Sequence, residues 1–194
     1  MGAPLIFHNW VATALVAGPF LGLALWEGRR FQGDGARRVR DPTYLVLQVA
    51  QITGAGLAIL AAYRVPGAEL PGSPWAWVGL GSLFGSCGAA LRAWAIATLG
   101  SQFTRAVTLE GPGHVVTAGP YRRLRHPSYT GALLFYLGLG LGLGNAISFV
   151  VCPAAAFLGY VVRIRHEERA LRRRLGDSYA EYARGTSRLV PGIW

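Results

Sequence analysis

The stretch YTGALLFYLGLGLGLGNAISFVVCPAAAFLGYVV, residues 129–162, decides the fold class of this chain. It contains no charged residue and is divided only by Gly144-Asn145, a dipeptide that is typical of turns. We therefore expect two apolar helices, Tyr129–Leu143 and Ala146–Val162, joined as a tight antiparallel hairpin. Both are shorter than the roughly 20 residues that cross a 30 Å hydrocarbon core, so the hairpin needs neighbouring helices or a thinned bilayer.

Three longer apolar stretches precede the hairpin: Leu5–Trp26, Tyr44–Tyr63 and Trp75–Leu99. The chain is 52% hydrophobic and 14% charged, whereas soluble domains carry about 25% charged residues. The sequence thus predicts an all-α integral-membrane bundle of about five transmembrane helices. Arg92, the one arginine inside a span, either snorkels to the nearer membrane face or faces a pocket, and we favour snorkelling.

The arginines mark the two faces of this bundle. All 19 cationic residues are arginines, and the net charge is +10. They gather in segments 27–43, 100–128 and 163–194, whereas segment 64–74 carries one arginine and the turn 144–145 carries none. This alternation fits the positive-inside rule and predicts an N-terminus outside and a C-terminus in the cytoplasm. The membrane is expected to be a prokaryotic inner or plasma membrane. The basic residues would then meet membrane lipid.

Several other functions are disfavoured by the sequence. No basic patch carries a nucleic-acid-binding motif, so nucleic acid is not an expected partner. The two cysteines, Cys87 and Cys152, lie inside apolar stretches without the spacing of a zinc site, so no metal is expected. The run GLGLGLG, residues 138–144, lacks the strand that precedes a dinucleotide-binding loop, and we interpret its glycines as small residues for close helix packing.

The chain is expected to form a single domain, residues 1–194, with four parts. Residues 1–99 supply three spans, 100–131 form a polar loop, 129–162 form the hairpin, and 163–194 form a polar cytoplasmic tail. Because the loop and the tail flank the same hairpin, they reach the same membrane face. The sequence therefore predicts a pocket between them, with an apolar floor and a polar lid.

The end of the loop is expected to open the fourth helix. Proline disfavours helix interiors and restricts the residue before it, so His126-Pro127 marks this boundary. The amides of residues 128–130 would then be unpaired and would favour an anionic group such as a carboxylate. Considered by itself, His126 is more typical of a capping or interface histidine.

The tail carries a pair of acidic residues near the membrane. Arg163 and Glu167 are four residues apart and share one helix face, Glu168 lies on the neighbouring face, and Gly176 is expected to end the helix. A carboxylate so close to a membrane is costly without a partner, which Arg163 or a bound cation would supply. A solvated helix held by its arginines is the alternative interpretation.

Two segments together resemble a known family. GHVVTAGPYRRLRHPSYTG, residues 113–131, is followed by RIRHEERALRRRLGDSYAEYARGTSRLVPGI, residues 163–193. This set resembles the isoprenylcysteine carboxyl methyltransferase family of integral-membrane methyltransferases, which is related to the phospholipid methyltransferases. The resemblance covers roughly residues 98–193, about half of the chain, and is specific as a set although each short motif alone is weak.

The resemblance implies transfer of a methyl group from S-adenosyl-L-methionine to a lipophilic or small-molecule acceptor, for example an isoprenylcysteine-like carboxylate. It implies a catalytic pair, Arg163 and Glu167, with Arg163 paired to Glu167 and pointing toward the acceptor. Arg125 would contact the carboxylate of either the acceptor or the cofactor. The residues along the cofactor would be His114, Val115, Val116, Gly119, Tyr121, His126, Pro127, Tyr129, Glu167 and Glu168.

The expected chemistry needs little from the protein besides orientation. A sulfonium is a good methyl donor, so a carboxylate or thiolate acceptor needs no general base, only alignment and exclusion of water. An amine acceptor would require loss of a proton, with Glu167 or His126 as the candidate base. Two other functions stay open: a sterol-reductase-like enzyme that uses NADPH, and a non-enzymatic lipid-binding or transport protein.

Overall fold

The computed structural model describes residues 4–30, 41–65, 67–100 and 115–194. Over these ranges the regular elements are helices, which confirms the all-α prediction, and the β-structure in the described residues consists of isolated bridges. The elements are the short 3-10 turns η1 (Leu5–Phe7) and η3 (Gly119–Arg122) and the helices α1 (Trp10–Arg30), α2 (Pro42–Arg64), α3 (Pro74–Leu99), α4 (Pro127–Gly142) and α5 (Ala146–Arg184).

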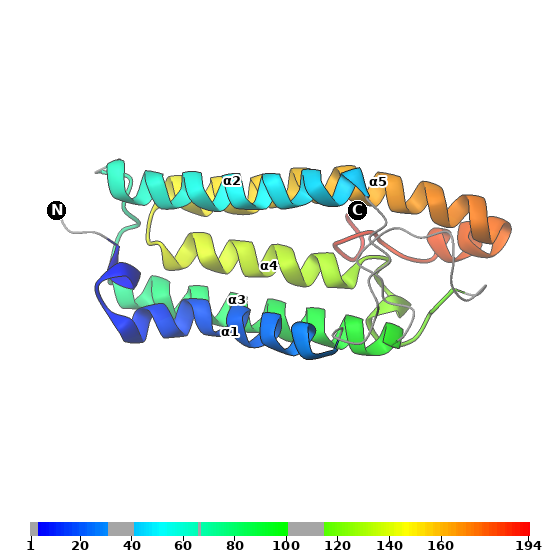
Figure 1. Cartoon of the computed structure of the whole chain (residues 1–194), viewed down its shortest axis with the longest axis horizontal. Helices are drawn as coiled ribbons and strands as arrows, with labels where there is room; N and C mark the ends of the chain where they lie inside the picture. The colour runs from blue at the N-terminus through cyan, green and yellow to red at the C-terminus, as the bar shows by residue number, and fades with distance from the viewer. Residues whose placement is uncertain (1–3, 31–40, 66, 101–114) are drawn as a thin grey trace.

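Helix α4 lies at the centre of the bundle (Figure 1). Helices α1 and α3 pack together on one side of it, and α2 and α5 pack together on the other. Among the described residues, α1, α2, α3 and α5 are each long and apolar enough to cross a membrane. With 16 residues α4 is shorter, and as expected for a short apolar helix it contacts all four of the others.

Glycines bring α3 and α4 into backbone contact. A Cβ atom added to Gly88 of α3 would lie 2.4 Å from the carbonyl oxygen of Gly131 on α4. Two helical turns further along α4, a Cβ atom added to Gly138 would lie 2.5 Å from the carbonyl oxygen of Gly81 on α3. Such close approach is how small residues stabilise helix pairs in membranes. The interpretation of the 138–144 glycines as packing residues is therefore confirmed for Gly138, Gly140 and Gly142, whereas a Cβ at Gly144, in the turn, would meet nothing within 4 Å.

Three helices begin at a proline. Pro42, Pro74 and Pro127 occupy the first turns of α2, α3 and α4, where the missing proline N–H is not needed. The observed helices therefore start one or two residues before the predicted spans. Helix α1, in contrast, starts later than the predicted Leu5, because the Asn9 side chain accepts hydrogen bonds from the first amides of α1 and separates it from η1.

Helix α5 does not end with the apolar stretch. The predicted boundary at Val162 is wrong, because the 39-residue helix continues through the change of polarity to Arg184. The backbone bends at Gly176, whose φ of 53° lies in the left-handed region that glycine tolerates, which agrees with a helix break there. The side chains of the tail are thus carried on the same helix that forms the second arm of the hairpin.

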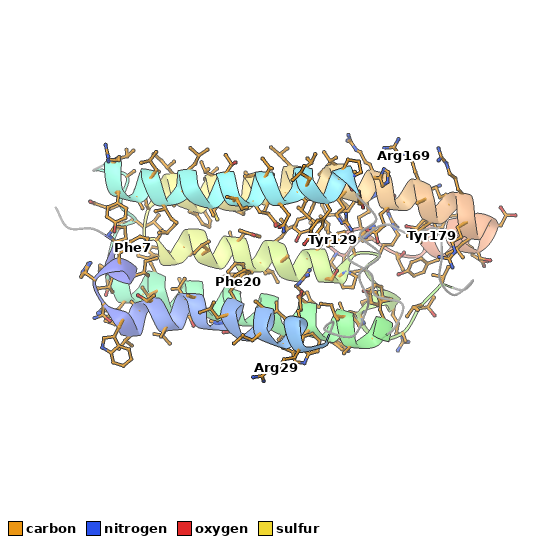
Figure 2. All side chains as sticks on the ribbon, viewed as in Figure 1. Phe7, Phe20, Arg29, Tyr129, Arg169 and Tyr179 are labelled. Atoms are coloured by element: carbon orange, nitrogen blue, oxygen red, sulfur yellow. The ribbon has the colours of Figure 1, made fainter. Side chains whose placement is uncertain are left out.

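The two ends of the bundle differ in charge. At one end the arginine-poor connections meet, since the Leu70 amide donates to Gly144 (2.8 Å) and the Ala146 amide donates to Ala68 (2.7 Å). At the other end the loop meets the tail, since the Arg125 amide donates to the Ser187 carbonyl at 2.7 Å. In Figure 2, Arg29 and Arg169 lie on the outside toward this second end, whereas Tyr129 points between the helices.

Candidate active site at the arginine-rich end

A cavity of about 380 Å³ opens between the helices near the arginine-rich end. This volume is within the range of small-molecule sites. Its apolar wall includes Phe20, Leu23, Leu47 and Phe135, from three different helices. Its polar wall consists of Glu27, Tyr44, Gln48, Gln51, Arg92, Tyr121, Arg125, His126, Ser128, Tyr129, Tyr136, Tyr160, Arg163 and Glu167. The predicted combination of apolar and polar walls is present.

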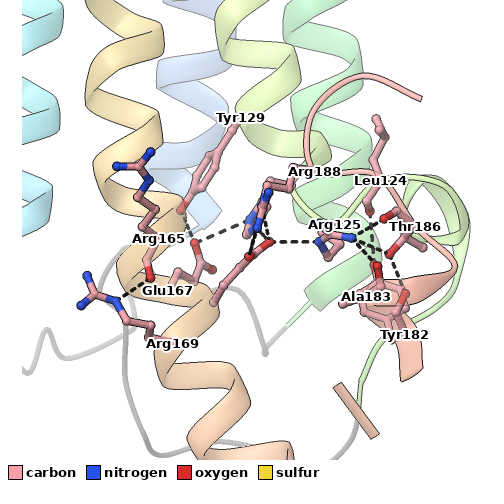
Figure 3. A network of polar contacts seen from close by, with 12 residues as sticks. Leu124, Arg125, Tyr129, Arg165, Glu167, Arg169, Tyr182, Ala183, Thr186 and Arg188 are labelled. Carbon is pink, nitrogen blue, oxygen red and sulfur yellow. Dashed lines mark hydrogen bonds and ion pairs between the residues drawn. The ribbon is translucent and has the colours of Figure 1, made fainter. Parts of the chain in front are cut away.

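A line of hydrogen bonds runs along the polar wall, and Figure 3 shows its contact between Tyr129 and Glu167. The Tyr129 hydroxyl donates to Glu167 Oε2 at 2.7 Å and accepts from Arg163 Nε at 2.9 Å. Arg163 in turn donates to Asp41 Oδ2 at 3.0 Å. The predicted direct pair between Arg163 and Glu167 is therefore wrong: Tyr129 stands between them, and the ion pair of Arg163 is with Asp41.

His126 lies at the end of this line and is almost fully enclosed, with 4% of its side chain exposed. Its Nδ1 lies 3.8 Å from Glu167 Oε2, and its ring stacks against Tyr129 with 5.4 Å between the ring centres. Its Nε2 lies 3.5 Å from Glu168 Oε1 and forms no hydrogen bond within the described ranges. The structure thus brings His126 and Glu167 together at one cavity, as the prediction of a shared pocket requires.

The carboxylate of Glu168 is already paired with arginine side chains of the protein. Its carboxylate pairs with Arg125 and Arg188, each at 3.0 Å, and it does not line the cavity. Burial alone would raise the pKa of this carboxyl, but the nearby His126 ring and the Arg188 and Arg125 guanidinium groups outweigh burial and lower the pKa to about 2. Glu168 is therefore ionised at neutral pH.

Arg125 links the end of the polar loop to the C-terminal tail through hydrogen bonds. Besides Glu168 it donates to the Ala183 carbonyl at 2.7 Å and to the Thr186 carbonyl (Figure 3). The Tyr182 hydroxyl adds a second link by donating to the Tyr121 carbonyl at 2.8 Å. These contacts close the arginine-rich end of the bundle, so Arg125 has a structural task that the sequence did not indicate.

Two of the three amides that were expected to form an anion site at the start of α4 are not available for it. The amides of Tyr129 and Thr130 donate to the His126 carbonyl at 3.0 and 3.1 Å and are therefore paired. Pro127 is buried in the first turn, as expected, and has no amide hydrogen to offer.

The remaining predicted residues lie beside the cavity. Val115 lines a second, more open hollow of about 680 Å³, together with Thr117, Tyr182 and residues of the tail. Val116 is half-buried and lines neither hollow. Gly119 has a φ of 55° and packs against Thr98 of α3. His114 lies outside the described residues.

Sequence reasoning missed the polar residues that the first spans contribute. Arg92 pairs with Glu27 of α1 through two contacts of 2.7 and 3.3 Å and lines the cavity, so the favoured snorkelling interpretation is wrong. Deeper in the bundle, Gln51 donates to the Tyr160 hydroxyl at 3.1 Å. The sequence did contain a signal for the Glu27–Arg92 pair, because each of the two is a charged residue near the end of a predicted span.

The apolar helices define an integral-membrane protein, and the polar cavity at one end has the size of a small-molecule site. Residues 80–173 match the isoprenylcysteine carboxyl methyltransferase family. This match confirms the resemblance seen in the sequence. The matched segment extends from α3 into the tail part of α5 and includes Arg92, Tyr129 and Glu167.

Individual relatives agree with this assignment. Protein-S-isoprenylcysteine O-methyltransferase B of Arabidopsis thaliana is 36% identical over 108 residues, 55% of each chain. The protein-S-isoprenylcysteine O-methyltransferase of Dictyostelium discoideum is 36% identical over 120 residues, 60% of this chain and 49% of that one. The aligned part thus spans about half the length of these curated relatives.

A solved structure has the same fold. The eukaryotic intramembrane Ras methyltransferase, an isoprenylcysteine carboxyl methyltransferase, is superimposed with a TM-score of 0.61 and 25% sequence identity. The match covers 99% of this chain and 68% of the other. The likeness therefore includes the three N-terminal helices, for which the sequence offered no recognisable motif.

Proposed function

We propose that this chain is an S-adenosyl-L-methionine-dependent methyltransferase that modifies a lipophilic carboxylic acid at the membrane interface. The observation that carries the proposal is the single cavity that joins Arg163, Tyr129, Glu167 and His126 to an apolar wall. The names of the relatives support a prenylated cysteine as the acceptor. The lipophilic tail of such an acceptor would pack against the apolar wall, and its carboxylate would lie at the polar wall.

The residues around the cavity fit the cofactor chemically. S-Adenosyl-L-methionine carries an ammonium, a carboxylate and hydroxyl groups, and it supplies a methyl group on a positively charged sulfur when bound. Glu167 offers a carboxylate that is half-exposed toward the cavity, and His126 offers a buried nitrogen that lacks a hydrogen bond within the described residues. Tyr121 and Tyr129 offer aromatic faces beside them.

The proposed cofactor residues form two groups. Tyr121, His126, Tyr129 and Glu167 would contact the cofactor from the main cavity. The others would shape the wall or act through their backbone: His114, Val115, Val116, Gly119, Pro127 and Glu168. In this proposal Glu168 acts through His126, because its own carboxylate is held by Arg125 and Arg188.

Arg163 would hold the acceptor. A guanidinium forms paired hydrogen bonds with a carboxylate and keeps it ionised, and an ionised oxygen attacks a methyl carbon without a general base. Tyr129 keeps Arg163 and Glu167 at a fixed separation, so the acceptor and the donor would be held in one orientation. The surrounding helices exclude water from the reacting groups.

The membrane setting completes the proposal. We place the arginine-rich end at the cytoplasmic face of a prokaryotic inner or plasma membrane, with the N-terminus outside. The exposed arginines of the tail would then lie among anionic lipid headgroups.

The direct test uses the purified full chain in lipid nanodiscs with radiolabelled S-adenosyl-L-methionine. A prenylated cysteine with a free carboxylate should accept a methyl group that alkali releases, and the same compound as its methyl ester should accept none. Binding of NADPH in place of the methyl donor would favour the reductase. Binding of neither S-adenosyl-L-methionine nor NADPH would favour a non-enzymatic protein.

A further inference from the structure

Asp41 performs two tasks at the start of α2. One carboxylate oxygen, Oδ1, caps the helix by accepting from the amide (2.9 Å) and the hydroxyl (2.6 Å) of Thr43. The other oxygen, Oδ2, accepts from Arg163 at 3.0 Å. Both charged side chains are enclosed, with 4% of Arg163 and 3% of Asp41 exposed. Asp41 precedes residue 80, where the match to the family begins.

The Asp41 contact fixes one edge of the Arg163 guanidinium. A second contact, from Arg163 Nε to the Tyr129 hydroxyl at 2.9 Å, fixes another edge. A planar guanidinium that is held at two edges by groups from different helices has a defined orientation. Since Arg163 lines the cavity, its orientation decides how it presents its N–H groups to a ligand.

We infer that Asp41 is a positioning residue, which orients Arg163 toward the acceptor from the N-terminal half of the chain. The effect on catalysis rests on the proposed function, whereas the orientation of Arg163 does not. Asp41 itself does not line the cavity, so it acts through Arg163. A partner of this kind affects the reaction because small displacements of a holding group reduce the rate strongly.

A purely structural role makes a different prediction. If Asp41 only caps α2, asparagine should replace it without loss, because asparagine and aspartate are equally good caps. Asparagine cannot replace the ion pair, since it carries no charge. The substitution Asp41→Asn therefore separates the two tasks, and Asp41→Ala removes both.

The test measures Arg163 directly and then its effect. Phenylglyoxal modifies arginines, and peptide mass spectrometry gives the rate at each position. In Asp41→Asn, Arg163 should react several-fold faster, whereas Arg92, which is held by Glu27, should react at the wild-type rate. Asp177→Asn, at an exposed acidic position on the tail, is the matched control and should change neither rate.

Kinetics provide the second readout. In Asp41→Asn we expect kcat/KM for the acceptor to fall by about 10- to 100-fold, with unchanged affinity for the methyl donor and a melting temperature near that of the wild type. Asp41→Ala should show the same kinetic defect and a lower melting temperature.

The outcomes separate the two proposals. An unchanged Arg163 labelling rate, or wild-type kinetics in Asp41→Asn, would overturn the positioning role. Equal loss of donor binding and acceptor turnover would also overturn it, because that result indicates general damage. If the wild type transfers no methyl group, the proposed function fails, and the labelling rates alone still decide whether Asp41 orients Arg163.

Discussion

Tyr129 is the residue through which the polar wall of the cavity is connected. Its hydroxyl accepts from Arg163 and donates to Glu167, and its ring stacks on His126. Removal of the hydroxyl would leave the enclosed Arg163 guanidinium and the partly exposed Glu167 carboxylate with one hydrogen bond fewer each. At the residue scale, the site therefore depends on how its side chains are held as much as on which side chains are present.

Tyr129→Phe tests this dependence. We expect methyl transfer to fall by about 10-fold or more, because an enclosed charged group that loses a hydrogen bond costs about 1–3 kcal/mol. Steady-state kinetics with the prenylated acceptor would measure the effect. Tyr63→Phe, at an exposed position near the opposite end of the bundle, is the control. Unchanged kinetics in Tyr129→Phe would contradict the proposed role of the hydroxyl.

Glu168 should make stability depend on pH. Its pKa is lowered from 4.5 to about 2 in the folded protein, so the unfolded state binds the proton more readily. Its contribution, about 3 kcal/mol from this pKa difference, is present above about pH 4.5 and is lost as the pH falls toward 2. Thermal unfolding of detergent-solubilised protein between pH 3 and 7 would measure it.

The matched variant for this titration is Glu168→Gln, which keeps the shape of the side chain and removes its charge. We expect a lower melting temperature at pH 7, because Arg125 and Arg188 lose their shared partner. The difference from the wild type should shrink as the pH is lowered through the window from 4.5 to 3. A difference that stays constant with pH would show that Glu168 is not the titrating group.

At the scale of elements, the contact between α3 and α4 sets the geometry of the cavity. The glycines at this contact let the two backbones touch, and α4 carries His126, as its N-cap, and Tyr129 at its first turn. Any residue that separates these helices would therefore move the polar wall of the cavity as well. Stability and activity should fall together when this contact is disturbed.

Gly88→Ala is the sharpest test of the contact, because the new Cβ would lie 2.4 Å from the Gly131 carbonyl oxygen. We expect destabilisation of about 1–3 kcal/mol from overpacking, seen as a lower melting temperature, with reduced methyl transfer. Gly79→Ala is the matched control on the same helix, since a Cβ there meets nothing within 4 Å. Equal melting temperatures for the two variants would argue against backbone contact.

At the scale of the whole molecule, the fold separates an arginine-poor end from an arginine-rich end that holds the site. Cysteine labelling with a membrane-impermeant maleimide tests the proposed orientation, after Cys87 and Cys152 are replaced by alanine. Ala68→Cys should react in intact cells, whereas Asp177→Cys should react only after the membrane is opened. Labelling of both from the same side would contradict a bundle that crosses the membrane in this way.

The sequence by itself determined the helices, their polarity and the part of the site that comes from the loop and the tail. Hydropathy, proline positions and the arginine alternation are local properties, and the spacing of His126 and Glu167 around an uncharged hairpin was enough to place them together. Helix boundaries were less certain, because α5 continues across a change of polarity that leaves the backbone unaffected.

Only the tertiary structure decided which charges are paired. Asp41 and Arg163 are 122 positions apart, and Glu27 and Arg92 are 65 apart. Whether such residues meet depends on the register and closeness of helix packing, which the glycine contacts between α3 and α4 help to set. Sequence patterns record the face on which a residue lies, but the partner opposite that face is determined by how the helices pack against one another.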